Sequence, residues 1–247
     1  MKKQYCIANW KMNKSFHDCE EFVTKLNNEF IYNGSEMVIC PSFIHLNRMK
    51  FLTKNIKIDI GSQTISENKN GAYTGEISAE MLTDINIKYS IIGHSERRHL
   101  FNEKDIAIRN KVFNAARNKI KPILCIGETL KERKSNKTNE VLKMQIKIAC
   151  ETANFIDDNI IIAYEPVWAI GTGVAADLDT ISKTHEQIRA FLPTFLKKSE
   201  NISILYGGSV NNDNCRDIIN LNDVDGFLIG GAALDAQMFL NIYNKMN

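Results

Sequence analysis

The chain has 247 residues, enough to bury a substantial core in one large α/β domain or in two smaller ones. Its 31 lysines and arginines nearly balance its 29 aspartates and glutamates, and the formal net charge of +2 argues against a broad surface for nucleic acid or anionic membrane. Although 44% of the residues are hydrophobic, no apolar run approaches the roughly 18 residues that span a bilayer. We therefore expect a soluble protein with neither nucleic acid nor membrane as a partner.

The amino terminus and the cysteines bear on location and redox state. Only residues 1–4 precede the first apolar run, which leaves no room for a secretory signal, so a cytoplasmic location is expected. The six cysteines include no C-x-x-C pair and are expected to be reduced and buried. The five histidines form no H-E-x-x-H pattern and none has ligand spacing to a cysteine, so no metal site is expected.

Short apolar or β-branched runs recur along the chain and predict eight β-strands. They lie at residues 5–8, 37–40, 58–61, 89–92, 123–126, 160–163, 204–206 and 227–229. Eight units in 247 residues give about 31 residues each, close to the length of a strand-helix-strand unit.

The segments between these runs have the spacing of amphipathic helices. Ser15 and Asp18 form a capping box ahead of a first apolar stripe, and Gly34 marks its expected end. The polar run 131–139 is expected to be an exposed loop or the first turn of a helix. The first stripe contains Phe22, Val23 and Leu26, and a later one contains Ile181, His185, Ile188, Leu192 and Phe195.

Alternating strands and helices require a parallel sheet with right-handed crossovers. Eight units with no residues left for a second domain predict a single (β/α)8 barrel of the TIM-barrel class over residues 1–247. The competing fold is an open, doubly wound sheet, which usually carries G-x-G-x-x-G after its first strand. Here that position holds Asn9-Trp10-Lys11-Met12-Asn13.

Glu165 stands where the apolar run 160–163 gives way to Pro166, which cannot donate to a sheet ladder. Taken alone, this segment favours a solvated loop glutamate, and an active base beside a lid is the alternative. In a barrel the active-base interpretation gains support, because the carboxyl ends of the strands bring distant residues to one rim. The residues brought to this rim are Asn9, Lys11, His94, Glu165, Ser209 and Gly230.

Two of these side chains suggest charge stabilisation. Lys11 follows the first strand, where its ammonium could hold a phosphate and offset developing negative charge; the alternative is a solvated lysine. His94 precedes Ser95, which is expected to cap a helix with Glu96 in its first turn. The helix dipole would keep the His94 ring neutral and able to donate a hydrogen bond, the alternative being a histidine that packs or caps locally.

Three turns rich in small residues, 171–173, 207–209 and 230–232, suggest a phosphate cradle. Glycine lets backbone N–H groups approach an anion, and barrels often bind phosphate with the loops after strands seven and eight. Three ordinary tight turns are the alternative.

Several long motifs resemble the triosephosphate isomerase family, and the match runs essentially end to end. These motifs are Asn9-Trp10-Lys11-Met12-Asn13, Gly71-Ala72-Tyr73-Thr74-Gly75-Glu76, Gly93-His94-Ser95-Glu96-Arg97-Arg98, Tyr164-Glu165-Pro166-Val167-Trp168-Ala169-Ile170-Gly171-Thr172-Gly173 and Tyr206-Gly207-Gly208-Ser209-Val210.

The resemblance implies an isomerase that interconverts dihydroxyacetone phosphate and glyceraldehyde 3-phosphate through an enediolate. It implies that Glu165 is the base, that His94 and Lys11 stabilise the enediolate, and that residues 166–175 form a closing lid. It further implies no cofactor and no metal. For substrate binding it implies Asn9 and backbone groups of Gly171, Ser209, Gly230 and Gly231.

The same resemblance implies a homodimer, because the loop 71–76 with Thr74 looks like one that inserts into a neighbouring subunit. The chain departs from the family pattern at Val174, where the lid commonly has Lys, and at Thr64, where Asn often follows Gln. Smaller departures occur at Asn102, Asn136 and Ala233. Another phosphate-binding barrel enzyme and a non-catalytic relative remain the rival interpretations, although neither explains Asn9, Lys11, His94 and Glu165 together.

Overall fold

The computed structural model describes residues 2–151, 159–169 and 176–246. Across these ranges eight parallel strands follow one another in chain order and close into a barrel, because β1 pairs with both β2 and β8. The predicted (β/α)8 barrel is confirmed. The strands are β1 Tyr5–Asn9, β2 Glu36–Cys40, β3 Ile58–Ser62, β4 Tyr89–Ile92, β5 Lys121–Ile126, β6 Ile161–Tyr164, β7 Ser203–Tyr206 and β8 Gly226–Ile229.

Each predicted run overlaps one strand, and the bounds differ by up to two residues. β1 extends to Asn9, which pairs in register with Cys40, although the apolar run ends one residue earlier. β5 begins two residues early, at Lys121, whose N–H donates to the Lys88 carbonyl. β6 begins one residue late and ends at Tyr164. Polar end residues can take part in a ladder, so apolar runs alone misplace strand ends.

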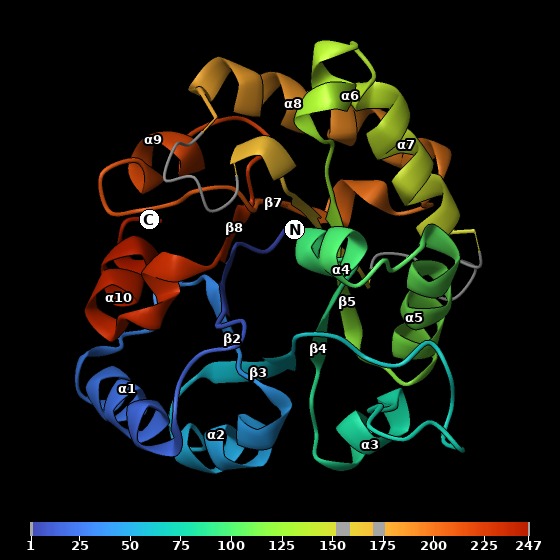
Figure 1. Cartoon of the computed structure of the whole chain (residues 1–247). Coiled ribbons are helices and arrows are strands. Elements are labelled where there is room, and N and C mark those ends of the chain that lie inside the picture. Colours follow the sequence, from blue (N-terminus) through green and yellow to red (C-terminus); the bar gives the residue numbers. More distant parts are fainter. Residues whose placement is uncertain (1, 152–158, 170–175, 247) are drawn as a thin grey trace.

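Helices surround the barrel (Figure 1), and α1 lies beside α10, so the first and last helices of the chain are neighbours. Among the described residues no helix combines the length and apolar character needed to cross a bilayer. The helices are α1 Phe16–Glu29, α2 Leu46–Leu52, α3 Ala79–Asp84, α4 Ser95–Leu100, α5 Asp105–Arg117, α6 Leu130–Lys134, α7 Thr138–Ala149, α8 Leu178–Phe191, α9 Cys215–Ile219 and α10 Ala236–Asn244.

The helix signals are confirmed at starts more often than at ends. The Ser15–Asp18 capping box is present at the start of α1. Gly34 is not the helix stop, because α1 ends at Glu29 and its last turn is closed by the N–H of Phe30.

Two further helix predictions need correction. α8 ends at Phe191, and the 3-10 turn Leu192–Thr194 follows, because Pro193 cannot continue the α-helical hydrogen bonds. Leu192 and Phe195 therefore lie beyond the helix whose stripe they seemed to extend. The run 131–139 is not one loop: it holds the last four residues of α6, a short turn and the first two residues of α7.

Two apolar layers hold the barrel. Ile7 and Val38 belong to the cluster inside it, whereas their neighbours Cys6 and Met37 belong to the cluster between strands and helices. Successive side chains on a strand point to opposite faces, so both faces of every strand are buried. This double burial explains why the strands are nearly continuous apolar runs.

Candidate active site

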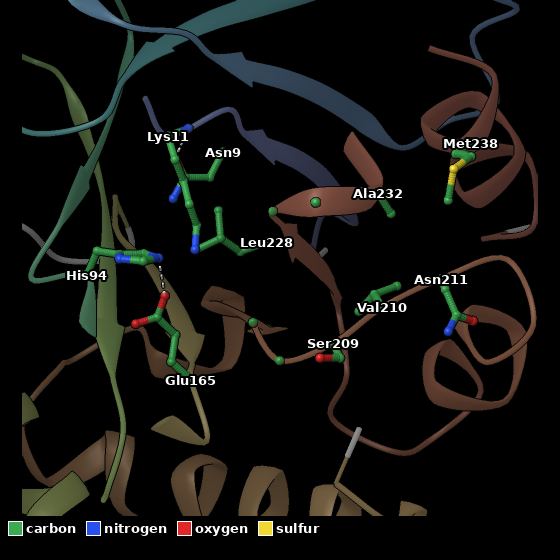
Figure 2. A pocket seen from close by; sticks show the side chains of 14 residues that line it. Asn9, Lys11, His94, Glu165, Ser209, Val210, Asn211, Leu228, Ala232 and Met238 are labelled. Carbon is green, nitrogen blue, oxygen red and sulfur yellow. Dashed lines mark hydrogen bonds and ion pairs between the residues drawn. The ribbon is translucent and has the colours of Figure 1, made fainter. Parts of the chain in front are cut away.

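A cavity of about 350 Å³ opens at the carboxyl-terminal end of the barrel (Figure 2). It gathers residues that are far apart in the sequence, as the barrel predicted. Among the residues lining it are Asn9, Lys11, His94, Glu165, Ser209, Gly230 and Gly231. Gly171, the remaining predicted substrate contact, lies outside the described residues.

Glu165 follows β6 directly and is only 2% exposed. Its N–H donates to the Ile126 carbonyl at 2.7 Å, which continues the β5–β6 ladder by one step. Its carboxylate accepts the Ser95 N–H at 2.8 Å and faces His94 Nε2 at 3.0 Å. The glutamate is therefore a buried, oriented carboxylate and not a solvated loop residue.

The backbone of Glu165 can pack against the backbone of Gly127 only because Gly127 has no side chain. A Cβ on Gly127 would lie 1.8 Å from the Glu165 carbonyl oxygen, too close for any other residue. The backbone after β5 thus fixes the backbone after β6, which places the carboxylate over the barrel mouth.

His94 caps helix α4 with its own ring, so the expectation that Ser95 is the cap is wrong. The ring nitrogen Nδ1 accepts the Glu96 N–H at 3.2 Å, and Ser95 is the first helical residue. An acceptor nitrogen carries no proton, so in the neutral ring the proton resides on Nε2 and is donated to Glu165. Helix capping thereby selects the tautomer that points an N–H donor into the cavity.

The turn that presents His94 is fixed by its neighbours. Gly93 has a φ of +73°, a left-handed conformation that favours glycine. The Arg98 guanidinium donates to the Gly93 carbonyl at 2.7 Å and to the Cys125 carbonyl at 3.2 Å, and it pairs with Asp105 at 2.6 Å. This arginine joins the turn after β4 to β5.

Lys11 has a left-handed backbone, with a φ of +53°, although it is not a glycine. Such a conformation costs roughly 1–2 kcal/mol for a residue with a side chain. Its N–H donates to Asn9 Oδ1 at 3.1 Å, and its ammonium pairs with Glu96 at 2.6 Å. Asn9 and Glu96 thus hold Lys11 directly.

The Lys11 side chain extends toward the turn after β8. A Cβ built on Gly230 would lie 3.4 Å from Lys11 Cε and 3.8 Å from Nζ. On the other side of the cavity Ser209 donates from its hydroxyl to the Ala169 carbonyl at 3.0 Å. An anion between Ser209 and Gly230 would therefore lie near the ammonium.

Two polar residues near this rim were missed from the sequence. Gln63 follows β3 and donates to the Lys11 carbonyl, and Glu128 follows β5 and is fully buried. Glu128 Oε1 accepts from Arg133, from the Tyr164 hydroxyl and from Trp168 Nε1, at 3.0–3.2 Å. Their position just after strands was a signal available in the sequence.

Cys125 lies beneath Glu165 without the character of a nucleophile. Burial, followed by the charge of the Glu165 carboxylate, raises the pKa of its thiol well above the usual value. The residue is a buried thiol in the barrel core.

Comparison with known proteins agrees with this geometry. Residues 4–246 match the family described as Triosephosphate isomerase. The chain belongs to the triosephosphate isomerase family. It is 40% identical over 251 residues to a triosephosphate isomerase of Alkaliphilus oremlandii, covering 99% of this chain and 100% of the relative. It is 41% identical over 249 residues to that of Alkaliphilus metalliredigens, with 99% and 100% covered. The protein of the same name from Mesomycoplasma hyorhinis is 39% identical over 249 residues, with 98% of each chain covered.

Of the departures from the triosephosphate isomerase pattern, Val174 lies outside the described residues. Thr64 does have a visible consequence: its hydroxyl receives a hydrogen bond from the buried Lys111 ammonium at 3.1 Å. The loop after β3 is thereby anchored to helix α5.

Proposed function

We propose that this chain is a triose-phosphate isomerase that interconverts dihydroxyacetone phosphate and D-glyceraldehyde 3-phosphate, the conversion used in glycolysis and gluconeogenesis. The whole chain, 1–247, would act as one catalytic barrel domain. The observation that carries the proposal is the pair of Glu165 and His94, 3.0 Å apart and facing one cavity with Lys11. A carboxylate base beside a neutral donor and a cation suits proton abstraction next to a carbonyl.

In this proposal Glu165 removes a proton from the carbon beside the carbonyl and returns it to the neighbouring carbon. Without substrate the carboxylate is occupied by the Ser95 N–H and the His94 ring. A bound substrate competes for the His94 donor with its own oxygens, which releases the carboxylate toward the carbon. Ser95 is therefore a supporting residue that holds the base in place with a hydrogen bond.

His94 and Lys11 stabilise the negative charge of the enediolate. The His94 Nε2–H donates to its oxygens, and the Lys11 ammonium, kept in place by Glu96, lowers the energy of the anion. Asn9 is proposed to orient the same oxygens from the end of β1.

The phosphate group is proposed to lie between the turns after β7 and β8. Backbone groups of Ser209, Gly230 and Gly231 would bind it, together with Gly171 from the lid segment 166–175. Closure of that segment would exclude water, which protects the enediolate from losing phosphate. The described part of the segment already meets the β7 turn through the Ala169 carbonyl. We expect neither a cofactor nor a metal.

A homodimer is part of the proposal. A groove of about 280 Å³ lies beside Lys11, lined in part by Met12, Gln63 and Phe101. Met12 is 96% exposed and Phe101 is 68% exposed, which suits a covered surface. The loop 71–76 of a second copy, with Thr74, is the proposed occupant. A cytoplasmic location is also proposed, because the six cysteines are all buried free thiols.

A coupled assay that follows interconversion of the two triose phosphates tests the activity. We expect turnover without added metal or cofactor. A protein that turns over a different phosphorylated sugar, or none, would favour the rival enzyme or the non-catalytic relative. Sedimentation velocity over a dilution series tests the dimer.

A further inference from the structure

The backbone of Lys11 is held in its left-handed conformation by a side chain from another strand. The Gln63 side-chain amide donates one hydrogen bond to the Lys11 carbonyl at 2.8 Å and a second to the Cys40 carbonyl at 3.0 Å. Gln63 follows β3, Cys40 ends β2 and Lys11 follows β1, so one amide group joins three neighbouring strand ends.

The hydrogen bond from Gln63 to the Lys11 carbonyl stabilises a residue whose backbone conformation is unfavourable. A non-glycine residue with positive φ persists only when its surroundings favour it over the relaxed conformations. The Lys11 carbonyl also accepts a hydrogen bond from the Ser42 hydroxyl at 3.2 Å, and the Lys11 N–H donates to the side-chain oxygen of Asn9. Of the two donors to this carbonyl, Gln63 is the closer.

The loop that carries Gln63 is itself anchored to helix α5. The neighbouring Thr64 accepts a hydrogen bond from Lys111, whose ammonium is also 2.8 Å from Glu103. Lys111 is only 5% exposed, and burial lowers its pKa. Arg97, on helix α4 next to Glu96, pairs with the other oxygen of the same Glu103. The β3 loop and the helix that carries Glu96 therefore share one buried ion cluster.

We infer that Gln63 is a positioning residue for Lys11: its amide holds the lysine backbone so that the ammonium is directed across the cavity toward Gly230. Gln63 acts through Lys11 and does not touch the substrate. The inference rests on the proposed function, because the role of Lys11 does. A lysine released to a relaxed backbone conformation directs its side chain elsewhere, and misplacement by about 1 Å can cost on the order of 100-fold in rate.

The test is a double-mutant cycle between Gln63→Met, which keeps length and removes both donors, and Lys11→Met. We expect Gln63→Met to lower kcat by about 10- to 100-fold when Lys11 is present. In the Lys11→Met background the same change should cost less than about twofold, because no ammonium remains to be positioned. A merely structural role predicts equal losses in both backgrounds, and that result, or full activity of Gln63→Met, would overturn the inference.

Gln4→Met serves as the matched control, since Gln4 is also half-buried but lies at the other end of the barrel, where it accepts from Ser35. It should leave kcat unchanged. If Gln63→Met does not fold, the nearly isosteric Gln63→Glu is compared in the same two backgrounds, with the loss again expected only when Lys11 is present, because a carboxylate has no N–H to donate to either carbonyl.

The failure of this inference is distinct from that of the proposed function. An inactive wild-type protein would defeat the proposed function alone. The inference is then judged by a crystal structure of Gln63→Met, or of Gln63→Glu if Gln63→Met does not fold. We expect Lys11 to leave the left-handed region, and an unchanged Lys11 backbone would overturn the inference.

Discussion

Two carboxylates at opposite ends of the barrel, Asp225 and Glu165, are held in different ways. At the amino-terminal end the Arg189 guanidinium pairs with Asp223 at 3.0 Å and with Asp225 at 2.7 Å. It also donates to the carbonyls of Ser199 and Ile202. The Asp225 carboxylate in turn accepts the N–H of Ile204, in β7. Each charge here is neutralised within the protein.

At the carboxyl-terminal end the Glu165 carboxylate is better hidden from solvent but meets no lysine or arginine among the described residues. It is held by one backbone N–H and by the ring of His94. No lysine or arginine has to be displaced before the Glu165 carboxylate can act, whereas the Asp225 carboxylate is held by a guanidinium. The Arg189 cluster at the amino-terminal end therefore serves stability, whereas Glu165 at the carboxyl-terminal end is kept available for reaction. The following predictions test this division, in order of decreasing expected effect.

Substitution of the base should have the largest effect. Glu165→Gln keeps the size of the side chain and its contact with the Ser95 N–H but removes the proton acceptor, so kcat should fall by roughly 10²- to 10⁴-fold. Shortening the side chain in Glu165→Asp moves the carboxylate by about 1 Å and should cost on the order of 100-fold. Steady-state kinetics of triose phosphate interconversion measures both, and full activity of either variant would remove Glu165 from its proposed role.

Loss of the ring donor should come next. His94→Asn retains an acceptor that can cap helix α4, but its shorter side chain cannot reach the Glu165 carboxylate. We expect kcat to fall by roughly 10²- to 10³-fold with little change in thermal stability. An active His94→Asn protein would show that the ring is only a cap.

The amino-terminal end should respond in the opposite manner. Arg189→Met removes the guanidinium from the buried Asp225, from the half-buried Asp223 and from two carbonyls, which should lower the free energy of unfolding by about 3 kcal/mol. The kcat of the folded protein should not change. Urea unfolding measures the loss, and the exposed pair of Lys183 with Asp179 offers a control, since Lys183→Met should leave the unfolding transition in place. If Arg189→Met lowered kcat as well as stability, the proposed separation between the Arg189 cluster and the active site would be contradicted.

The smallest effect concerns pH and the fully buried His185. Burial lowers its pKa from 6.5 to about 4, although its Nδ1 contacts the Asp223 carbonyl at 3.0 Å. The unfolded chain binds the proton below pH 6.5 and the folded chain does not until about pH 4, so stability falls as the pH decreases through this window. Between pH 7 and pH 5 the loss should be about 2 kcal/mol. A His185→Gln variant should lack this part of the pH dependence, and parallel profiles for the two proteins would contradict it.

The sequence revealed the barrel because strands buried on both faces are apolar throughout, so each run could be recognised without knowing its partners. It revealed Glu165 and His94 because both stand at strand ends. It did not reveal that His94 caps α4 with its own ring, since side-chain rotation decides between His94 and Ser95. Nor could it reveal the hydrogen bonds of Gln63, whose partners lie at the ends of two other strands, or the pairing of Arg189 with Asp223 across 34 residues of chain.

The pairing of β1 with β8 has a consequence for synthesis of the protein. Tyr5 lies in register with Gly226, and its N–H donates to Asp225, so some 220 residues separate the two sides of this seam. Until the ribosome has released the final segment, the growing chain can form only an incomplete sheet with two unsatisfied edges. Translation beyond residue 226 is therefore the step that first allows closure, and nascent chains that stall earlier should be the forms that chaperones bind and that aggregate.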